Sequence, residues 1–105
     1  MNWVKVASAR DMENDEAKTV SVGGNGIALF RIDDEFFATD SMCTHGAALL
    51  SEGFVEDGCI ECPLHQGRFD IRTGQAMCAP VTANIRTHLV KREGDDIFVL
   101  VGDDK

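Results

Sequence analysis

Apolar and polar side chains alternate over short stretches along most of this chain. Runs rich in Val, Ile, Phe and Thr occur at 3–7, 18–22, 27–32, 35–40, 59–62, 84–90 and 96–101. Branched and aromatic side chains pack well on a pleated sheet, and alternation places one face of each strand on a core. The pattern therefore predicts an all-β fold built from short strands.

Turn-forming residues separate these runs. Gly, Asn and Asp cluster at 23–26, 33–34, 56–58 and 93–96, and they tolerate the positive φ angles that tight hairpins require. The segment 8–17 begins with a serine that can cap a helix, but it has too few periodic apolar positions for a long one. We expect hairpins at the four clusters and at most one helical turn at 8–17.

Composition limits the kind of molecule this is. The chain has 105 residues, of which 44% are hydrophobic, so one folded domain over 1–105 is expected. Its longest unbroken apolar runs, such as 27–30, are too short to span a membrane, and no secretory signal is recognisable at the start. These features predict a cytoplasmic protein. A net charge of -8 disfavours nucleic acid and anionic lipid and favours a basic protein partner.

The middle of the chain carries a distinctive set of cysteines and histidines. Cys43-Thr44-His45 is followed by sixteen residues and then by Cys62-Pro63-Leu64-His65, so each arm offers one thiolate and one imidazole. Zinc fingers usually pair like residues in each arm. A cysteine nucleophile would not need a second arm. A two-iron cluster needs each arm to supply one ligand to each iron, and this spacing does so.

The residues around both arms resemble a known family. "CTHG" at 43–46 and "CPLHQGRFD" at 62–70 are similar to the Rieske [2Fe-2S] motif. With "TGQAMCAPVT" at 73–82 and "IFVLV" at 97–101, the chain most resembles the small Rieske ferredoxins of naphthalene-type aromatic-ring dioxygenases, with the biphenyl and carbazole systems close by. The resemblance implies an antiparallel β-sandwich base with a cluster-binding subdomain, about 41–82, at one tip.

The resemblance also implies a role for each motif residue in binding one [2Fe-2S] cluster. Cys43 and Cys62 would bind the buried iron, and His45 and His65 would bind the outer iron near the surface. Further residues of the cluster loops are expected to lie beside these ligands: Thr44, Gly46, Gln66, Gly67 and Pro80.

Departures from the respiratory members of the superfamily predict a low reduction potential. Those proteins join the two loops by a disulfide, and here the matching positions are Ala48 and Leu64. They also place Ser and Tyr hydroxyls against the cluster sulfurs, where this chain has Gly67 and Phe69. Hydrogen bonds to sulfur stabilise the reduced cluster, so their loss predicts a midpoint potential of roughly -150 mV.

The function that the resemblance implies is one-electron transfer. The protein would accept electrons from a flavin-dependent NAD(P)H ferredoxin reductase and deliver them to a terminal Rieske non-haem-iron oxygenase. It would not be an enzyme itself, and it would dock only transiently with both partners. Two alternatives remain: the small Rieske-like subunit of a nitrite reductase, and a zinc-stabilised binding module.

The remaining two cysteines and the third histidine are not part of the cluster motif. Cys59 and Cys78 complete no ligand pattern and are expected to be buried free thiols. His88 has no cysteine or carboxylate at ligand spacing and is expected to be an ordinary surface histidine.

Two further groups bear on docking. Acidic residues expected near the tip are candidates for contacts with a partner: Asp40, Glu52 and Asp70. Apolar residues that flank the ligand loops can either pack in the core or form an apolar rim around the histidines, and the sequence leaves both options open: Met42, Leu49, Leu50 and Phe54.

Overall fold

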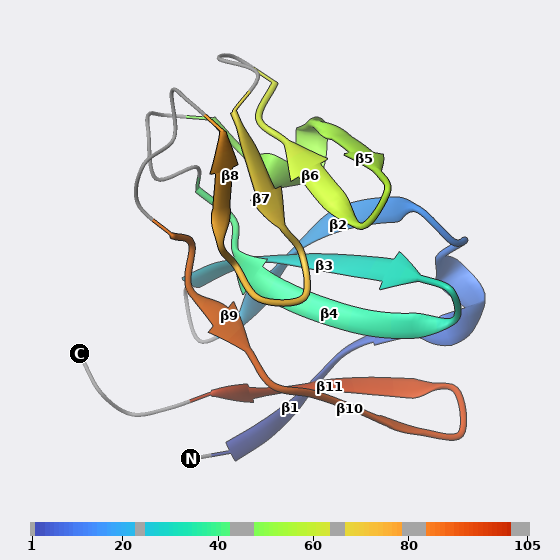
Figure 1. Ribbon diagram of the computed structural model, residues 1–105. Helices are drawn as coiled ribbons and strands as arrows, with labels where there is room; N and C mark the ends of the chain where they lie inside the picture. The colour runs from blue at the N-terminus through green and yellow to red at the C-terminus, as the bar shows by residue number, and fades with distance from the viewer. Residues whose placement is uncertain (1, 23–24, 43–47, 64–66, 79–83, 102–105) are drawn as a thin grey trace.

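The strands of this protein form three stacked antiparallel sheets (Figure 1). The computed structural model describes residues 2–22, 25–42, 48–63, 67–78 and 84–101 of the chain. Within these ranges the regular elements are eleven β-strands and two short 3₁₀ helices. The predicted all-β fold is therefore confirmed. No helix among the described residues is long and apolar enough to cross a membrane.

Each of the three sheets contains three or four strands in a simple order. The middle sheet has the order β2-β3-β4-β9, with β2 (Glu16–Val22), β3 (Asn25–Ile32), β4 (Glu35–Asp40) and β9 (Thr87–His88). The lower sheet has the order β1-β11-β10, with β1 (Asn2–Ser8), β11 (Asp96–Val101) and β10 (Val90–Glu93). The upper sheet has the order β5-β6-β7-β8, with β5 (Phe54–Glu56), β6 (Cys59–Glu61), β7 (Arg68–Asp70) and β8 (Ala76–Cys78).

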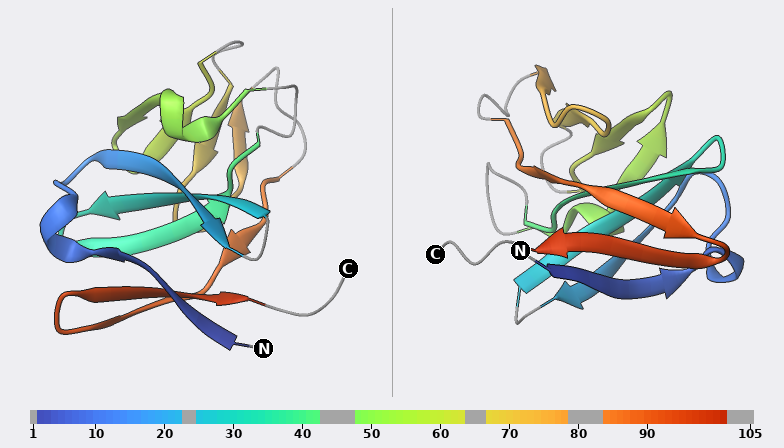
Figure 2. Two further views of the ribbon diagram at one scale, coloured as in Figure 1. Left: turned by 180° about the vertical axis from the view of Figure 1, so that it is seen from behind. Right: turned by 90° about the horizontal axis from the view of Figure 1, so that it is seen from below.

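The strand β3 lies between two hydrophobic cores, and the views in Figure 2 show the same layered order. Successive side chains of a strand point to opposite faces of its sheet. Ile27 and Leu29 accordingly pack with Ile97 of the lower sheet, whereas Phe30 packs with Phe69 of the upper sheet. The unbroken apolar run at 27–30 is thus a strand buried on both faces.

The predicted turns and helical segment are confirmed where the structure describes them. Asp33 and Asp34 have φ angles of 51° and 66° in the β3–β4 hairpin, and Gly58 has a φ of 78° in the β5–β6 hairpin. Ser8 accepts a hydrogen bond from the backbone N–H of Arg10 at 3.4 Å, which caps the three-residue helix η1 (Ala9–Asp11).

Two features of the fold differ from the sequence prediction. The run at 84–90 forms two strands, because the chain leaves the middle sheet after His88 and joins the lower sheet at Val90. Leu89, at this crossing, is 66% exposed. The three-residue strands β5, β7 and β8 were not predicted, whereas β6, of the same length, falls in the predicted run at 59–62. An alternating pattern rarely stands out over only three residues.

Truncation of Phe30 should test the importance of the core beneath the upper sheet. Phe30 is fully buried, so Phe30→Ala should lower the free energy of unfolding by about 3–5 kcal/mol. Phe54→Ala is the matched control, because Phe54 is 66% exposed and its loss should change stability by only about 0.5 kcal/mol. Denaturant unfolding of both variants measures the difference. Equal losses would contradict the packing described above.

Candidate metal centre

Cys62 lies at the base of the loop that joins β6 to β7. The pairing of these strands ends at Glu61 and Arg68, and the next backbone hydrogen bond runs from the N–H of Cys62 to the carbonyl oxygen of Gly67 at 2.7 Å. This bond continues the ladder by one step and closes the base of the loop. The Cys62 side chain is fully buried. One predicted ligand is therefore held at a fixed place on the upper sheet.

The residues on either side of 43–47 are also held together. Met42 and Leu49 form an isolated antiparallel bridge, and the N–H of Leu50 donates to the carbonyl oxygen of Ser41 at 2.8 Å. Leu50 begins the short helix η2 (Leu50–Glu52), which leads into β5. The residues on the two sides of 43–47 are thus held next to each other, between the end of β4 and the start of η2.

The residues on either side of 79–83 are anchored in a similar way. The Asn84 side-chain oxygen accepts a hydrogen bond from the N–H of Ala76 at 2.9 Å, and the N–H of Ile85 donates to the Gly74 carbonyl oxygen at 2.8 Å. Gly74 is required at this contact, because its φ is 79° and a Cβ would lie 2.2 Å from the Ile85 oxygen. The residues on both sides of segment 79–83, which contains Pro80, therefore also lie beside the upper sheet.

One hydrophobic core joins all three of these anchor points. Cys62 is buried in the same core as Ala48 and Leu50 from the first segment and Ile85 from the third. Residues that are far apart in sequence thus meet at one end of the upper sheet. A fully buried cysteine at this meeting point fits the buried thiolate ligand that an iron–sulfur cluster requires.

Most of the other predicted site residues lie outside the described part of the chain. These are Cys43, Thr44, His45, Gly46, His65, Gln66 and Pro80. Their predicted roles stay predictions. Within the described ranges, no group of three or more His, Cys, Asp or Glu side chains could hold a metal ion. No alternative metal site is therefore indicated there.

The expectation for Cys59 requires a correction. Cys59 is only half-buried, whereas the sequence predicts a buried thiol. It pairs across the sheet with Glu56 and Asp70, at positions whose side chains point away from the core that contains Ile60. The alternation of the strand therefore turns Cys59 outward. Cys78 lies in β8, and its side chain is outside the described part of the structure.

The interpretation of His88 as an ordinary surface histidine is wrong. Its side chain is only 16% exposed, and its Nε2 atom lies 2.8 Å from Oδ1 of Asp40. The neighbouring backbone is tied as well, since the N–H of Asp40 donates to the Arg86 carbonyl oxygen at 2.9 Å. This contact joins the end of β4, which precedes Met42, to β9. No local sequence pattern signals the contact between His88 and Asp40, because 48 positions separate them.

The candidate docking acids occupy different environments. Asp40 is engaged with His88, and Glu52 is exposed in η2. Asp70 lies at the end of β7 that is remote from Gly67, so its predicted place near the tip is wrong. Its Oδ1 atom accepts hydrogen bonds from the N–H groups of Arg72 at 2.9 Å and Thr73 at 3.3 Å, which stabilises a turn.

The structure shows which of the apolar residues beside the loops pack in the core and which are exposed at the surface. Leu50 is fully buried and Leu49 is half-buried, so both contribute to packing. Met42 is 51% exposed and Phe54 is 66% exposed. Only Met42 and Phe54 therefore fit an apolar surface near the site.

Removal of the His88 side chain should loosen the junction between β4 and β9. His88→Ala should lower the free energy of unfolding by about 1 kcal/mol, because it removes a half-buried hydrogen bond to Asp40. His88→Gln keeps a hydrogen-bond donor and should lose less. Thermal or denaturant unfolding at constant pH compares the variants. If His88→Ala unfolds like the unchanged protein, the contact contributes nothing to stability.

Comparison with known proteins agrees with this geometry. The family model described as the Rieske [2Fe-2S] domain matches residues 2–102. The ferredoxin component of the naphthalene 1,2-dioxygenase/salicylate 5-hydroxylase systems of a Ralstonia species is 50% identical over 92 residues, which cover 88% of each chain.

Solved structures show the same architecture. The ferredoxin of carbazole 1,9a-dioxygenase from Nocardioides aromaticivorans IC177 superposes with a TM-score of 0.91 at 32% identity, over 94% of this chain and 97% of that one. A complex of reduced oxygenase and oxidised ferredoxin in carbazole 1,9a-dioxygenase contains a chain that matches with a TM-score of 0.87 at 38% identity, over 92% and 91% of the two chains. The present chain thus belongs to the Rieske [2Fe-2S] family and binds one cluster of this type.

Proposed function

We propose that this protein is the electron-carrying ferredoxin of an aromatic-ring-hydroxylating dioxygenase system. The observation that carries this proposal is the match, over most of both chains, to ferredoxin components of such systems. The described fold adds a rigid sheet that holds a buried cysteine at one end. The protein acts as a carrier, and the hydroxylation takes place in the oxygenase.

Four residues are proposed to hold the cluster, with two ligands on each iron. Cys43 and Cys62 bind one iron, and His45 and His65 bind the other. The burial of Cys62 beside Leu50 supports the cysteine assignment, because packed apolar side chains keep water away from the sulfur. When bound, the cluster supplies reversible one-electron chemistry, while the protein sets its potential and its access to partners.

In this proposal, the upper sheet supports the loop that begins at Cys62. Cys62 shares its core with Ile60 and Phe69, which are fully buried on neighbouring strands. This packing holds the base of the loop in one place whether or not the cluster carries an extra electron. Phe69 has no hydroxyl group to donate to a sulfur atom, in keeping with the low potential expected for this chain.

We propose a flavin-dependent NAD(P)H ferredoxin reductase as the electron donor and a terminal oxygenase as the acceptor. The solved complex of an oxygenase with a related ferredoxin supports the second partner. A nitrite reductase subunit is less favoured, because a relative with 50% identity is a dioxygenase ferredoxin. We place the protein in the cytoplasm, as is usual for a chain whose cysteines serve as metal ligands.

Replacement of Cys62 should abolish cluster binding. Cys62→Ser removes the proposed thiolate, so the purified variant should contain much less than two irons and two acid-labile sulfides per chain. Cys59→Ser is the matched control, since Cys59 lies three positions earlier on the same strand segment and is only half-buried. Metal analysis and visible absorption measure both variants. A fully loaded Cys62→Ser protein would show that the ligand assignment is wrong.

Reconstitution with purified partners tests the function itself. The cluster-loaded protein should link NADH oxidation by a dioxygenase-system reductase to substrate hydroxylation by the matching oxygenase, and its omission should stop the coupling. The control replaces the protein with the Cys62→Ser variant. Efficient coupling to a nitrite reductase, with none to any ring-hydroxylating oxygenase, would favour the alternative function.

A further inference from the structure

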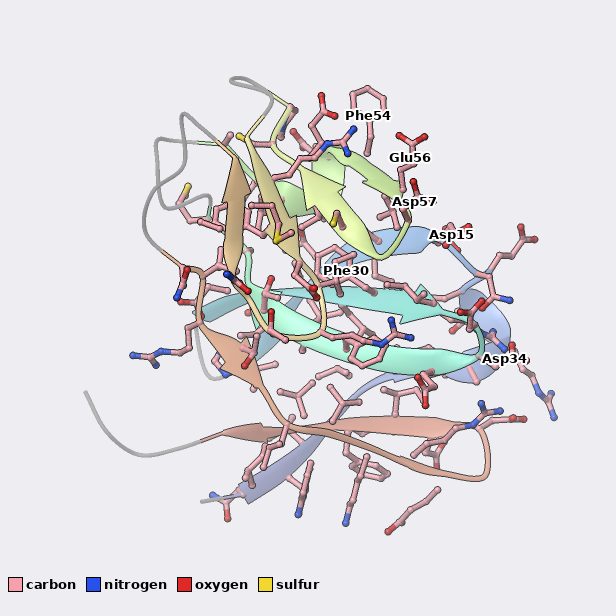
Figure 3. All side chains as sticks on the ribbon, viewed as in Figure 1. Asp15, Phe30, Asp34, Phe54, Glu56 and Asp57 are labelled. Carbon is pink, nitrogen blue, oxygen red and sulfur yellow. The ribbon has the colours of Figure 1, made fainter. Side chains whose placement is uncertain are left out.

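Phe54 is a large apolar side chain that the fold leaves in solvent. It is 66% exposed, although it belongs to a regular strand of the upper sheet. Its neighbour Val55 points the other way and packs against the core. Figure 3 shows Phe54 and Glu56 projecting outward from the same strand, whereas Phe30 lies inside between the layers. Packing within the molecule therefore does not account for this aromatic ring.

Phe54 lies beside the base of the proposed cluster loop. It pairs across the sheet with Glu61, the residue immediately before Cys62. The next strand places Arg68, which directly follows Gly67, opposite Glu61. The outer face of the sheet thus presents an exposed aromatic residue within one cross-strand step of the loop base. A partner that covers this face also approaches the cluster.

The backbone around Phe54 is fixed before any partner binds. Gly53 lies so close to β6 that a Cβ at this position would be 1.9 Å from the Glu61 carbonyl oxygen. The β5–β6 hairpin then turns at Asp57 and Gly58, whose φ angles are 56° and 78°. Ordering this backbone on association therefore costs little, which favours Phe54 as a docking contact.

The charges around Phe54 define the chemistry of the partner. Four carboxylates lie on or beside this strand, and one guanidinium accompanies them: Glu52, Glu56, Asp57, Glu61 and Arg68. Nη2 of Arg68 lies 3.4 Å from Glu61 and 3.7 Å from Glu56, so the surface keeps a negative excess. An apolar centre with an acidic surround is complementary to an apolar pocket bordered by Lys and Arg.

We infer that Phe54 is the apolar anchor by which this protein docks on a basic surface of its terminal oxygenase, with Glu52 and Glu56 adding electrostatic attraction. The inference rests on the proposed function and deepens it by naming the contact surface. Phe54 fills a shallow apolar pocket on the oxygenase, and the surrounding carboxylates face its basic residues. Buried aromatic anchors at the centre of an interface often dominate its affinity.

The decisive comparison is between Phe54→Ala and Leu89→Ala. Both side chains are 66% exposed, but Leu89 lies between β9 of the middle sheet and β10 of the lower sheet, outside the upper sheet. With cluster-loaded protein, Phe54→Ala should weaken binding to the purified oxygenase by about tenfold or more. Leu89→Ala should leave the Kd unchanged. Both variants should keep the midpoint potential of the unchanged protein and unfold close to its unfolding midpoint.

The other possible results of the binding experiment distinguish a wrong docking contact from a wrong function. If the unchanged protein binds and reduces the oxygenase but Phe54→Ala binds equally well, the anchor is wrong and the proposed function stands. If Phe54→Ala weakens binding only to the reductase, the assignment to the oxygenase is overturned. If the unchanged protein neither binds nor reduces the oxygenase, the proposed function fails and this inference fails with it.

A second comparison tests the charges. Glu56→Gln should reduce the dependence of oxygenase binding on ionic strength, because it removes one attractive charge from the docking face. Glu93→Gln is the matched control, since Glu93 also carries an exposed carboxylate in a loose ion pair, with Lys91 at 3.3 Å, but lies in the lower sheet. Equal salt dependence in both variants would overturn the electrostatic part of the proposal.

Discussion

Burial of β3 on both faces is the constraint on which the rest of this structure depends. Ile27 and Leu29 belong to one core, and Phe30 belongs to the other. The middle sheet can therefore bury its apolar side chains only when a second layer covers each face. The lower sheet covers one face. The upper sheet covers the other and also carries Cys62.

The core under the upper sheet connects folding to cluster binding. Ala48, Cys62 and Ile85 come from three separate segments and are buried in the same apolar cluster. The same burial that stabilises the fold thus brings together the ends of the two segments that hold the proposed ligands and of the third segment, which contains Pro80. A cluster bound at this end of the sheet would have a rigid base.

The two exposed sides of the molecule differ in a way that suits a carrier. The outer face of the upper sheet presents Phe54 with an excess of carboxylates, close to Cys62. In the lower sheet, lysines are paired with neighbouring acids, as in the contacts of Lys5 with Asp96 and Lys91 with Glu93.

The sequence by itself determined the all-β fold, the main hairpins and the cluster motif, because alternation, turn residues and ligand spacing are local properties of the chain. Only the tertiary structure decided contacts between distant residues. The pairing of His88 with Asp40, the outward position of Cys59 and the choice between Leu50 as core and Phe54 as surface all depend on which strands become neighbours. Sheet pairing across long separations sets those neighbours, and no local pattern encodes it.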